Sequence, residues 1–412
     1  MTSLSFDQKL NNLAELAVKV GVNLQPGQRF IIRAPLDSVP LVRLIAAKAY
    51  QSGARLVDVN WTDDGLTLAR FEHAPRDSFE EYPTWVAAGL NEVAQTGGAV
   101  LSIVGNDPDL LKDQDPDLVA LVQKLHRTHL GPFYSQLMKD GLNWSIISHP
   151  APAWAAKVFP AGTPEQQLAN LWEAIFRITR ADQPDPVAAW HAHTANLATR
   201  RDILTAKQYT ALHYRAPGTD LTLGLPENHV WHGGAKDTLT GVPFIPNMPT
   251  EEVFSMPHRD RVDGVVSSSL PLSYAGVLID DISLRFENGR VAHVSAKRGE
   301  ATLKKLIDTD EGAARLGEVA LVPHSSPIAQ SGLLFYNTLF DENAANHLAL
   351  GRAYRFCVQA GPAMTDDEFA AAGGNNSLTH VDFMIGSAQM DIDGVLPDGS
   401  VEPLMRAGEW AD

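Results

Sequence analysis

Helix-like and strand-like segments alternate through the N-terminal part of the chain, and this alternation restricts the possible folds more than any other feature. Residues 6–20 and 39–53 repeat apolar side chains at helical spacing, whereas residues 29–35 and 99–105 are short apolar runs typical of buried strands. Strands separated by helices of about ten to fifteen residues indicate βαβ units, in which the strands run parallel. The sequence therefore predicts an N-terminal α/β domain with a mostly parallel sheet.

The pattern changes after ADQPDP, residues 181–186, which is rich in proline and aspartate and is the best candidate for a linker. Beyond it lie short strand-like runs joined by turns, and FENGRV, residues 286–291, carries the Asn-Gly signal of a two-residue hairpin. Helices are expected at residues 302–309 and 341–351. We predict an α/β domain over residues 1–183 and a β-rich α+β domain over residues 184–412.

Composition and missing motifs exclude several classes of function. A formal net charge of −16 argues against a basic surface for DNA or RNA, and no GxGxxG, GxxxxGKS or GxxxxGKT motif supports a bound nucleotide. The single cysteine, Cys357, cannot form an intramolecular disulfide. No apolar run reaches the roughly twenty residues of a membrane helix. We therefore expect a cytoplasmic protein that binds neither nucleic acid nor membrane.

Residues able to bind a metal recur in apolar surroundings in the second half of the chain. Glu318 interrupts the apolar run LGEVALV, and burial of an unpaired carboxylate costs roughly several kcal/mol unless a partner such as a dication neutralises it. His380 and Asp382 lie two residues apart in the strand-like HVDFMIG, so both side chains should point to one face. The other members of this set are Glu251, Glu252, Glu342 and His347.

Each of these residues also has a purely structural explanation. Glu318 could begin a strand in solvent, and His380 and Asp382 could line the wet face of an antiparallel sheet. On a helix, Glu342 and His347 would lie roughly 140° apart, which counts against a shared site unless Glu342 lies where the helix begins. A purely structural explanation is nevertheless harder to accept for the whole set than for any one of its members.

The types of ligand restrict which metal ions the site could bind. Mixed imidazole and carboxylate sets suit Zn²⁺, Co²⁺ or Mn²⁺ better than Ca²⁺ or Mg²⁺, which prefer oxygen alone. About six ligands exceed the needs of one catalytic zinc and fit two ions roughly 3.5–4 Å apart that share a carboxylate. No HExxH motif is present, which excludes the common single-zinc pattern. Two-metal hydrolysis is therefore the expected chemistry.

At these residues the sequence resembles a known family. The segments PTEEVF, LGEVALV, FYNTLFDENAANHLALG, GRAY and HVDFMIG are similar in order and spacing to motifs of the M29 metallo-aminopeptidases, the aminopeptidase T and aminopeptidase S group of bacteria. The resemblance covers nearly the whole chain, including NWSIISHPAPAWA. It implies two divalent ions, whether zinc, cobalt, manganese or magnesium, held by Glu252, Glu318, Glu342, His347, His380 and Asp382.

The resemblance also implies individual roles. Glu318 would bridge the ions, and Tyr354 would be catalytic, as a hydroxyl donor to the oxyanion or to the leaving amine. If the segment around Glu251 and Glu252 is extended, only one of the two can face the ions. Glu252 is the expected ligand because its separation from Glu318 agrees with the family. Either Glu251 or the metal-bound hydroxide alone could then serve as general base.

The expected function is removal of the N-terminal residue from short peptides by a cytoplasmic homodimer whose first domain covers the site, as the resemblance implies. Two other functions stay open. A two-metal amidase or esterase acting on another small amide would need the same ligands. A non-catalytic α/β binding protein would have no physical need for so many buried carboxylates.

Overall fold

The computed structural model describes residues 4–411, which belong to two compact units. The first unit contains the chain up to His193 together with Ala235–Pro249, and the second contains Thr194–Gly234 and the chain from Thr250 onwards. Helix α8 (Pro186–Lys207) carries the chain from the first unit into the second. The predicted limits of 1–183 and 184–412 stay a prediction, because compactness alone does not show that a segment folds independently.

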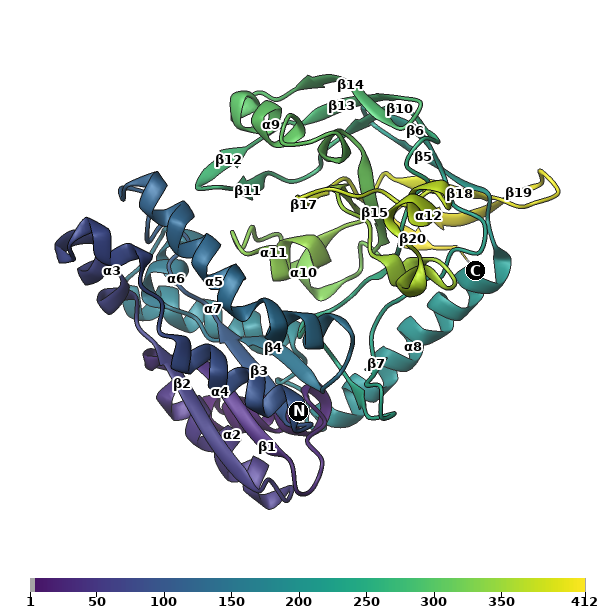
Figure 1. Cartoon of the computed structure of the whole chain (residues 1–412). Coiled ribbons are helices and arrows are strands. Elements are labelled where there is room, and N and C mark those ends of the chain that lie inside the picture. Colours follow the sequence, from purple (N-terminus) through teal and green to yellow (C-terminus); the bar gives the residue numbers. More distant parts are fainter. Residues whose placement is uncertain (1–3, 412) are drawn as a thin grey trace. The chain divides into compact units, whose positions relative to one another are not determined.

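The first unit contains a four-stranded sheet in the order β2-β1-β3-β4, with every pairing parallel (Figure 1). This confirms the predicted α/β architecture with a parallel sheet. Its strands are β1 (Arg29–Pro35), β2 (Leu56–Thr62), β3 (Ala99–Val104) and β4 (Trp144–Ser148). A small hairpin of β7 (Lys236–Asp237) and β8 (Pro243–Phe244) also belongs to this unit.

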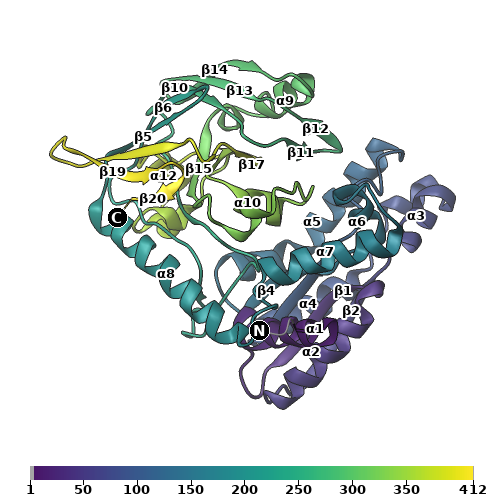
Figure 2. The ribbon, with the colours of Figure 1, turned by 180° about the vertical axis from the view of Figure 1, so that it is seen from behind.

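Helices cover both faces of the parallel sheet. Figure 1 shows α4 and α5 on one face, and the reverse view in Figure 2 shows α1, α2 and α7 on the other. Leu90 of α4 and Phe133 of α5 pack in one core with Ile31 and Val100 of the sheet. The helices of this unit are α1 (Phe6–Leu16), α2 (Val39–Gln51), α3 (Asp64–His73), α4 (Thr84–Gln95), α5 (Pro116–Met138), α6 (Pro152–Val158) and α7 (Pro164–Ile178), with shorter turns η1 (Ala17–Gly21), η2 (Leu36–Ser38) and η3 (Arg76–Glu80).

The larger sheet of the second unit has eight strands in the order β14-β13-β10-β6-β5-β18-β19-β20, all antiparallel. The predicted Asn-Gly hairpin is confirmed, because Asn288 and Gly289 join β13 to β14 with φ of 49° and 77°. The strands are β5 (Ala211–Ala216), β6 (Thr219–Gly224), β10 (Val262–Ser267), β13 (Ser283–Glu287), β14 (Arg290–Ser295), β18 (Asp391–Val395), β19 (Val401–Arg406) and β20 (Glu409–Trp410).

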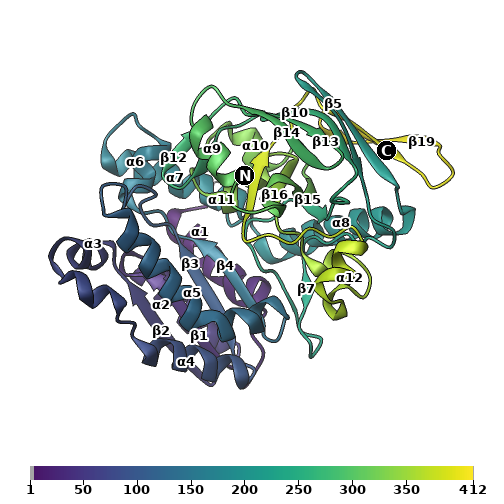
Figure 3. The same ribbon diagram turned by 45° about the horizontal axis from the view of Figure 1, so that its top comes forward.

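The smaller sheet of this unit is antiparallel, in the order β17-β16-β15-β9, and Figure 3 shows β15 and β16 side by side within it. Leu348 and Phe383 from one face of this sheet join Leu212 and Leu223 of the larger sheet in one core. The opposite face is free for other side chains. The strands are β9 (Val253–Ser255), β15 (Leu316–Leu321), β16 (His347–Gly351) and β17 (His380–Met384), and a separate hairpin consists of β11 (Leu272–Tyr274) and β12 (Val277–Ile279).

One expected helix of the second unit is correct and the other is wrong. The helix expected at residues 302–309 is α9 (Glu300–Ile307), but residues 341–351 form the short turn η5 (Glu342–Ala344) followed by strand β16. The tertiary context overrides the helix-favouring composition, because β16 pairs with a strand on each side and alternates Leu348 and Leu350 into the core. The remaining helices are α10 (Pro327–Ser331), α11 (Thr338–Asp341) and α12 (Asp366–Ala371), with turns η4 (Gly312–Ala314), η6 (Arg355–Cys357) and η7 (Gly361–Ala363).

Within residues 4–411, none of the helices combines the length and the apolar character that crossing a bilayer requires.

Candidate metal centre

The register of the four-stranded sheet gathers polar side chains on the face that points away from the core. Glu318 of β15 and Asp382 of β17 both lie opposite Ala349 of β16, so a single small side chain separates the two carboxylates. A β-bulge between Leu316 and Glu318 shifts the alternation of β15, which leaves Leu316 in the core and turns Glu318 away from it. The small residue and the bulge together leave room between two facing carboxylates.

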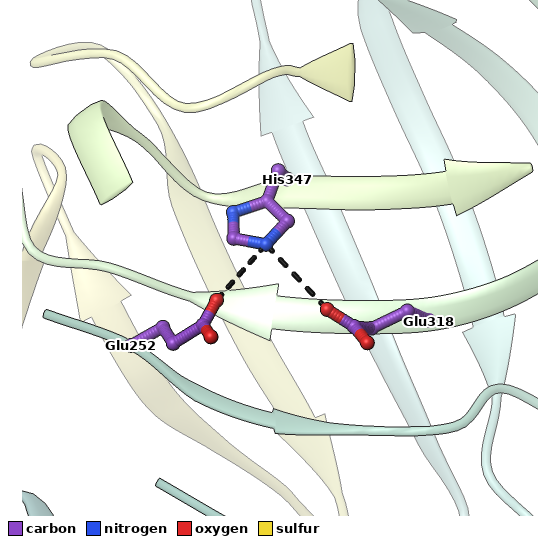
Figure 4. Close-up of side chains that lie close together, drawn as sticks. All are labelled: Glu252, Glu318 and His347. Atoms are coloured by element: carbon purple, nitrogen blue, oxygen red, sulfur yellow. Dashed lines mark ion pairs between the residues drawn. The ribbon is translucent and has the colours of Figure 1, made fainter. Parts of the chain in front are cut away.

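Two groups of three potential ligands share one member, Glu318. The ligand atoms of Glu252, Glu318 and His347 lie within 4.8 Å of one another, and so do those of Glu318, His380 and Asp382. Nε2 of His347 lies 3.1 Å from Oε2 of Glu252 and 3.6 Å from Oε1 of Glu318 (Figure 4). Nε2 of His380 lies 3.7 Å from Oε2 of Glu318 and 3.6 Å from Oδ1 of Asp382. The two oxygens of Glu318 therefore face different histidines.

Backbone carbonyls orient both imidazole rings. Nδ1 of His347 lies 3.1 Å from the carbonyl oxygen of Ala345, and Nδ1 of His380 lies 2.7 Å from that of Arg352. A carbonyl only accepts, so each Nδ1 carries a proton and donates it. In the neutral ring this leaves the lone pair of Nε2, the nitrogen that faces the carboxylates, for a metal ion. This is the tautomer that a metal ligand requires.

The electrostatics of the cluster favour an added cation. Burial raises the pKa of Glu318 to about 7, with the nearby imidazole of His347 opposing this shift and the charge of Asp382 adding to it. Burial, followed by the charges of Glu252 and Asp382, raises the pKa of Glu342 well above its ordinary value. Burial would lower the pKa of His347, but the close carboxylates of Glu252 and Glu318 outweigh it and raise that pKa strongly. Negative charge is thus crowded into a dry region, where a dication would relieve it.

Two buried oxygens also lack donors. Oε2 of Glu252 and Oδ1 of Asp382 are inaccessible to solvent and receive no hydrogen bond of good geometry from the described residues. The neighbouring histidine nitrogens lie close enough to these oxygens for ion pairs. Carboxylate oxygens and imidazole nitrogens in this number suit Zn²⁺, Co²⁺ or Mn²⁺. The residues present therefore fit divalent metal ions.

Glu342 and Glu251 lie beside these groups without belonging to either. Glu342 opens turn η5, and the charges of Glu252 and Asp382 act on its carboxylate. The N–H of Glu251 donates to Oδ1 of Asn343 at 2.7 Å, which fixes the backbone just before Glu252. Of the adjacent pair, only Glu252 contributes to a three-residue group. The assignment of all six ligands stays a prediction.

Tyr354 follows β16 and lies against the second group. Its ring stacks on Phe356 at 5.2 Å between centroids and lies 4.8 Å from the ring of His380. Burial, followed by the charges of Glu318 and Asp382, raises the pKa of Tyr354 well above its ordinary value. The phenol thus stays protonated at neutral pH. A proton donor is available beside the carboxylates.

Sequence reasoning missed the residues that support this arrangement. Asn343 is fully buried, accepts from the N–H of Glu251 and donates to the carbonyl oxygen of Leu339 at 3.1 Å. Asp341 accepts the N–H groups of Phe335 and Asn337, which fixes the loop before Glu342. Polar residues next to an expected ligand, as in FDEN, are the only signal that the sequence offered.

Comparisons with known proteins find the same family over nearly the full length of the chain. The family model described as thermophilic metalloprotease (M29) matches residues 6–410. Aminopeptidase 2 of Geobacillus stearothermophilus is 53% identical over 406 residues, which cover 98% of each chain. Aminopeptidase AmpS of Bacillus subtilis is 50% identical and covers 99% of each chain. The structure of wild-type AmpT from Thermus thermophilus matches with a TM-score of 0.93 at 45% identity, covering 99% of this chain and 100% of that one.

Proposed function

The chain belongs to the M29 family of metalloproteases and is an aminopeptidase of that family, and we propose that it works with two divalent ions, one on each side of Glu318. The observation that carries this proposal is the direction of the two Glu318 oxygens, each of which faces a different histidine. A carboxylate that belongs to two ligand groups is the bridging element that a two-metal site needs.

The proposed ligands divide into two sets. Glu252, His347 and Glu318 would hold one ion, with Glu342 completing its surroundings, and Glu318, His380 and Asp382 would hold the other. The mixture of imidazole and carboxylate favours zinc, cobalt or manganese over magnesium. When bound, the ions supply hydroxide near neutral pH and polarise the scissile carbonyl.

The chain's own residues perform the remaining steps. The protonated hydroxyl of Tyr354 would donate a hydrogen bond to the oxyanion of the tetrahedral intermediate or to the leaving amine. The buried carboxylate of Glu251, the residue before Glu252 whose backbone N–H donates to Asn343, would accept a proton as general base. The crowded carboxylates would also attract the free α-ammonium group of a short peptide, which restricts cleavage to its first residue.

We expect the enzyme to be a cytoplasmic homodimer that acts on short peptides. These expectations rest on the family resemblance, and gel filtration with light scattering checks the dimer directly.

One experiment tests the function as a whole. Metal content and hydrolysis of aminoacyl amides, with free and with acetylated α-amines, are measured before and after chelation and after re-addition of Zn²⁺, Co²⁺ or Mn²⁺. We expect chelation to remove activity, each suitable ion to restore it, and acetylation to abolish cleavage. Full activity in chelator contradicts the metal requirement. Equal cleavage of acetylated substrates points instead to a two-metal amidase.

A pair of variants separates the roles of the two adjacent glutamates. Glu252→Gln should lower the metal content and turnover together, because it removes a ligand. Glu251→Gln should retain both ions and lower turnover, because it removes only a base. The reverse pattern, with metal lost in Glu251→Gln alone, would exchange the two assignments.

A further inference from the structure

Asn375 lies in the segment that leads into β17, and its side chain contacts the end of β16. The residue is fully buried, and its Nδ2 donates to the carbonyl oxygens of Gly351 and Gly312 at 2.6 and 2.8 Å. Both partners are carbonyls, which only accept, so the amide group has its nitrogen on this side. One buried side chain therefore joins the end of β16 to the turn η4.

The backbone on both sides of Arg352 is held by the same segment. The N–H of Arg352 donates to the carbonyl oxygen of Thr379 at 2.7 Å, and the N–H of Ala353 donates to that of Asn375 at 2.8 Å. The peptide bond is planar and trans, so a fixed N–H also fixes the carbonyl on the opposite side of the same plane. The two peptide groups that flank the α-carbon of Arg352 are thus fixed in direction.

The carbonyl of Arg352 is the last member of these two peptide groups, and it orients His380. Its oxygen accepts the Nδ1–H of His380 at 2.7 Å, while the N–H of Ala353 in the same peptide group is directed to Asn375. The direction of the carbonyl sets the rotation of the ring, and therefore the direction of Nε2, which faces the carboxylates of the second ligand group. A continuous line of hydrogen bonds thus connects Asn375 to His380 through Arg352.

The backbones at this point approach each other closely. Gly351 has φ of 109°, and a Cβ there would lie 2.3 Å from the carbonyl oxygen of Thr379. A Cβ on Gly317 of β15 would lie 2.3 Å from the carbonyl oxygen of Gly351 and 2.4 Å from that of Arg352. Only glycine permits these approaches. Small displacements at the end of β16 are therefore passed directly to the carbonyl of Arg352.

The segment that carries Asn375 also has an anchor of its own. Asp310 accepts the hydroxyl of Ser377 at 2.8 Å and the N–H of Leu378 at 2.7 Å. These bonds do not involve the side chain of Asn375, so they remain when that side chain is replaced. The effect of a substitution at Asn375 should accordingly be local.

We propose that Asn375 is a positioning residue for His380, which it keeps directed at one of the two proposed ions by fixing the carbonyl of Arg352. This inference rests on the proposed role of His380 as a metal ligand. Loss of a group that orients a ligating histidine weakens metal binding by roughly 10–100-fold. Only the ion beside His380 should be affected, because the carbonyl oxygen of Ala345 orients the ring of His347.

Zinc affinities of the full-length protein, measured by competition with a chromophoric chelator, test this inference. His380→Ala identifies the ion that His380 holds, because that ion should be lost. Asn375→Leu removes the two donated hydrogen bonds at similar volume, and Oδ1 of Asn375 has no donor among the described residues that the change could remove as well. We expect Asn375→Leu to weaken the same ion at least tenfold and to leave the other within twofold. Excess zinc should restore most of the turnover.

The matched control is Asn143→Leu, the same change at a buried asparagine of the first unit. Asn143 is 1% exposed, and its Nδ2 donates to the carbonyl oxygen of Val22 at 2.6 Å. This control should lower stability and leave both zinc affinities within twofold. Asn375→Ser retains one donor and provides a milder variant if Asn375→Leu does not fold, which circular dichroism verifies. It should weaken the same ion by a smaller factor than Asn375→Leu.

The outcomes separate this inference from the proposed function. Unchanged zinc binding in the folded Asn375 variants, or equal weakening of both ions, would overturn the inference and leave the two-ion site intact. The same selective weakening in Asn143→Leu would also overturn it. Retention of both ions in His380→Ala would show that His380 is not a ligand, and the inference would then be wrong together with that part of the proposed function.

Discussion

The two four-stranded sheets of this chain place their polar residues differently. The parallel sheet of the first unit is covered by helices on both faces, and the middles of its strands carry apolar residues such as Ile32 and Leu101. The antiparallel sheet of the second unit has one face in the core and carries Glu318 and Asp382 on the other. In a sheet that is buried on both faces, polar functional side chains are placed at the ends of the strands. In a sheet that is buried on one face only, they can also lie in the middle of a strand, on the other face.

Buried charge, rather than buried polarity, distinguishes the two sheets. Ser145 of β4 is 1% exposed and its hydroxyl has no hydrogen-bond partner among the described residues. A neutral hydroxyl of this kind costs about 1–3 kcal/mol when left unpaired, whereas an isolated buried carboxylate costs much more. The carboxylates of the antiparallel sheet therefore need counter-ions that the parallel sheet does not.

The largest expected effect comes from Glu318→Gln, which neutralises the residue shared by both ligand groups. Turnover should fall by more than the roughly 10²–10³-fold that follows loss of one oxyanion donor, because both of the proposed ions would lose a ligand. Metal analysis should show loss of at least one ion per chain, while circular dichroism shows a folded protein. A variant that keeps two ions and normal turnover would contradict the metal-binding role proposed for Glu318, and with it the functional difference between the two sheets.

Tyr354→Phe should lower turnover by about 10²–10³-fold with both ions retained, because it removes only a proton donor beside the metal centre. Steady-state kinetics and metal analysis of the same sample check this result. Loss of the ions in this variant would instead make Tyr354 a structural part of the antiparallel sheet.

Chelation should make the stability of the protein depend strongly on pH. With a folded-state pKa of about 7 against an ordinary 4.5, Glu318 binds more protons in the folded than in the unfolded state, so stability falls as pH rises between these values. His347 acts in the same direction, since the stability from its raised pKa is lost above that pKa. One carboxyl shifted in this way changes the free energy of unfolding by roughly 3 kcal/mol.

Bound ions require deprotonated ligands and should reverse this trend. Thermal unfolding of chelated and metal-loaded protein at pH 5 and pH 8 provides the measurement. The chelated protein should be less stable at pH 8 than at pH 5, and the gain from metal should be larger at pH 8. A chelated protein that is as stable at pH 8 as at pH 5 would contradict the raised pKa values of Glu318 and His347, and with them the close packing of charge in the cluster.

The smallest effect is expected in the parallel sheet. Ser145→Ala removes a buried hydroxyl that has no partner, so the free energy of unfolding should change by at most about 1 kcal/mol or rise. Denaturant unfolding of this variant checks the result, with metal content and turnover unchanged. A large loss of stability would show that the hydroxyl has a role that the described contacts do not reveal.

Local patterns predicted those parts of the fold that depend on one strand or helix at a time. The alternation in HVDFMIG correctly indicated a strand with His380 and Asp382 on one face and Phe383 on the other. Residues 341–351 were misread because their alanines and leucines suit a helix, and the pairing of β16 with two distant strands decides otherwise.

The arrangement of the metal centre could not be read from the sequence. It depends on the bulge before Glu318, on the register that places Ala349 between two carboxylates, and on carbonyl oxygens of Ala345 and Arg352 that no side-chain pattern encodes. The proposed ligands were predicted from their residue types and from the family resemblance. Their pairing around Glu318 required the structure.

The central claim is that Glu318 lies between two ions, and anomalous diffraction from crystals of the zinc-loaded enzyme tests it most directly. We predict two anomalous peaks per chain, one beside Glu252 and His347 and the other beside His380 and Asp382, with one oxygen of Glu318 within bonding distance of each. A single peak, or two peaks that both lie away from Glu318, would contradict the claim.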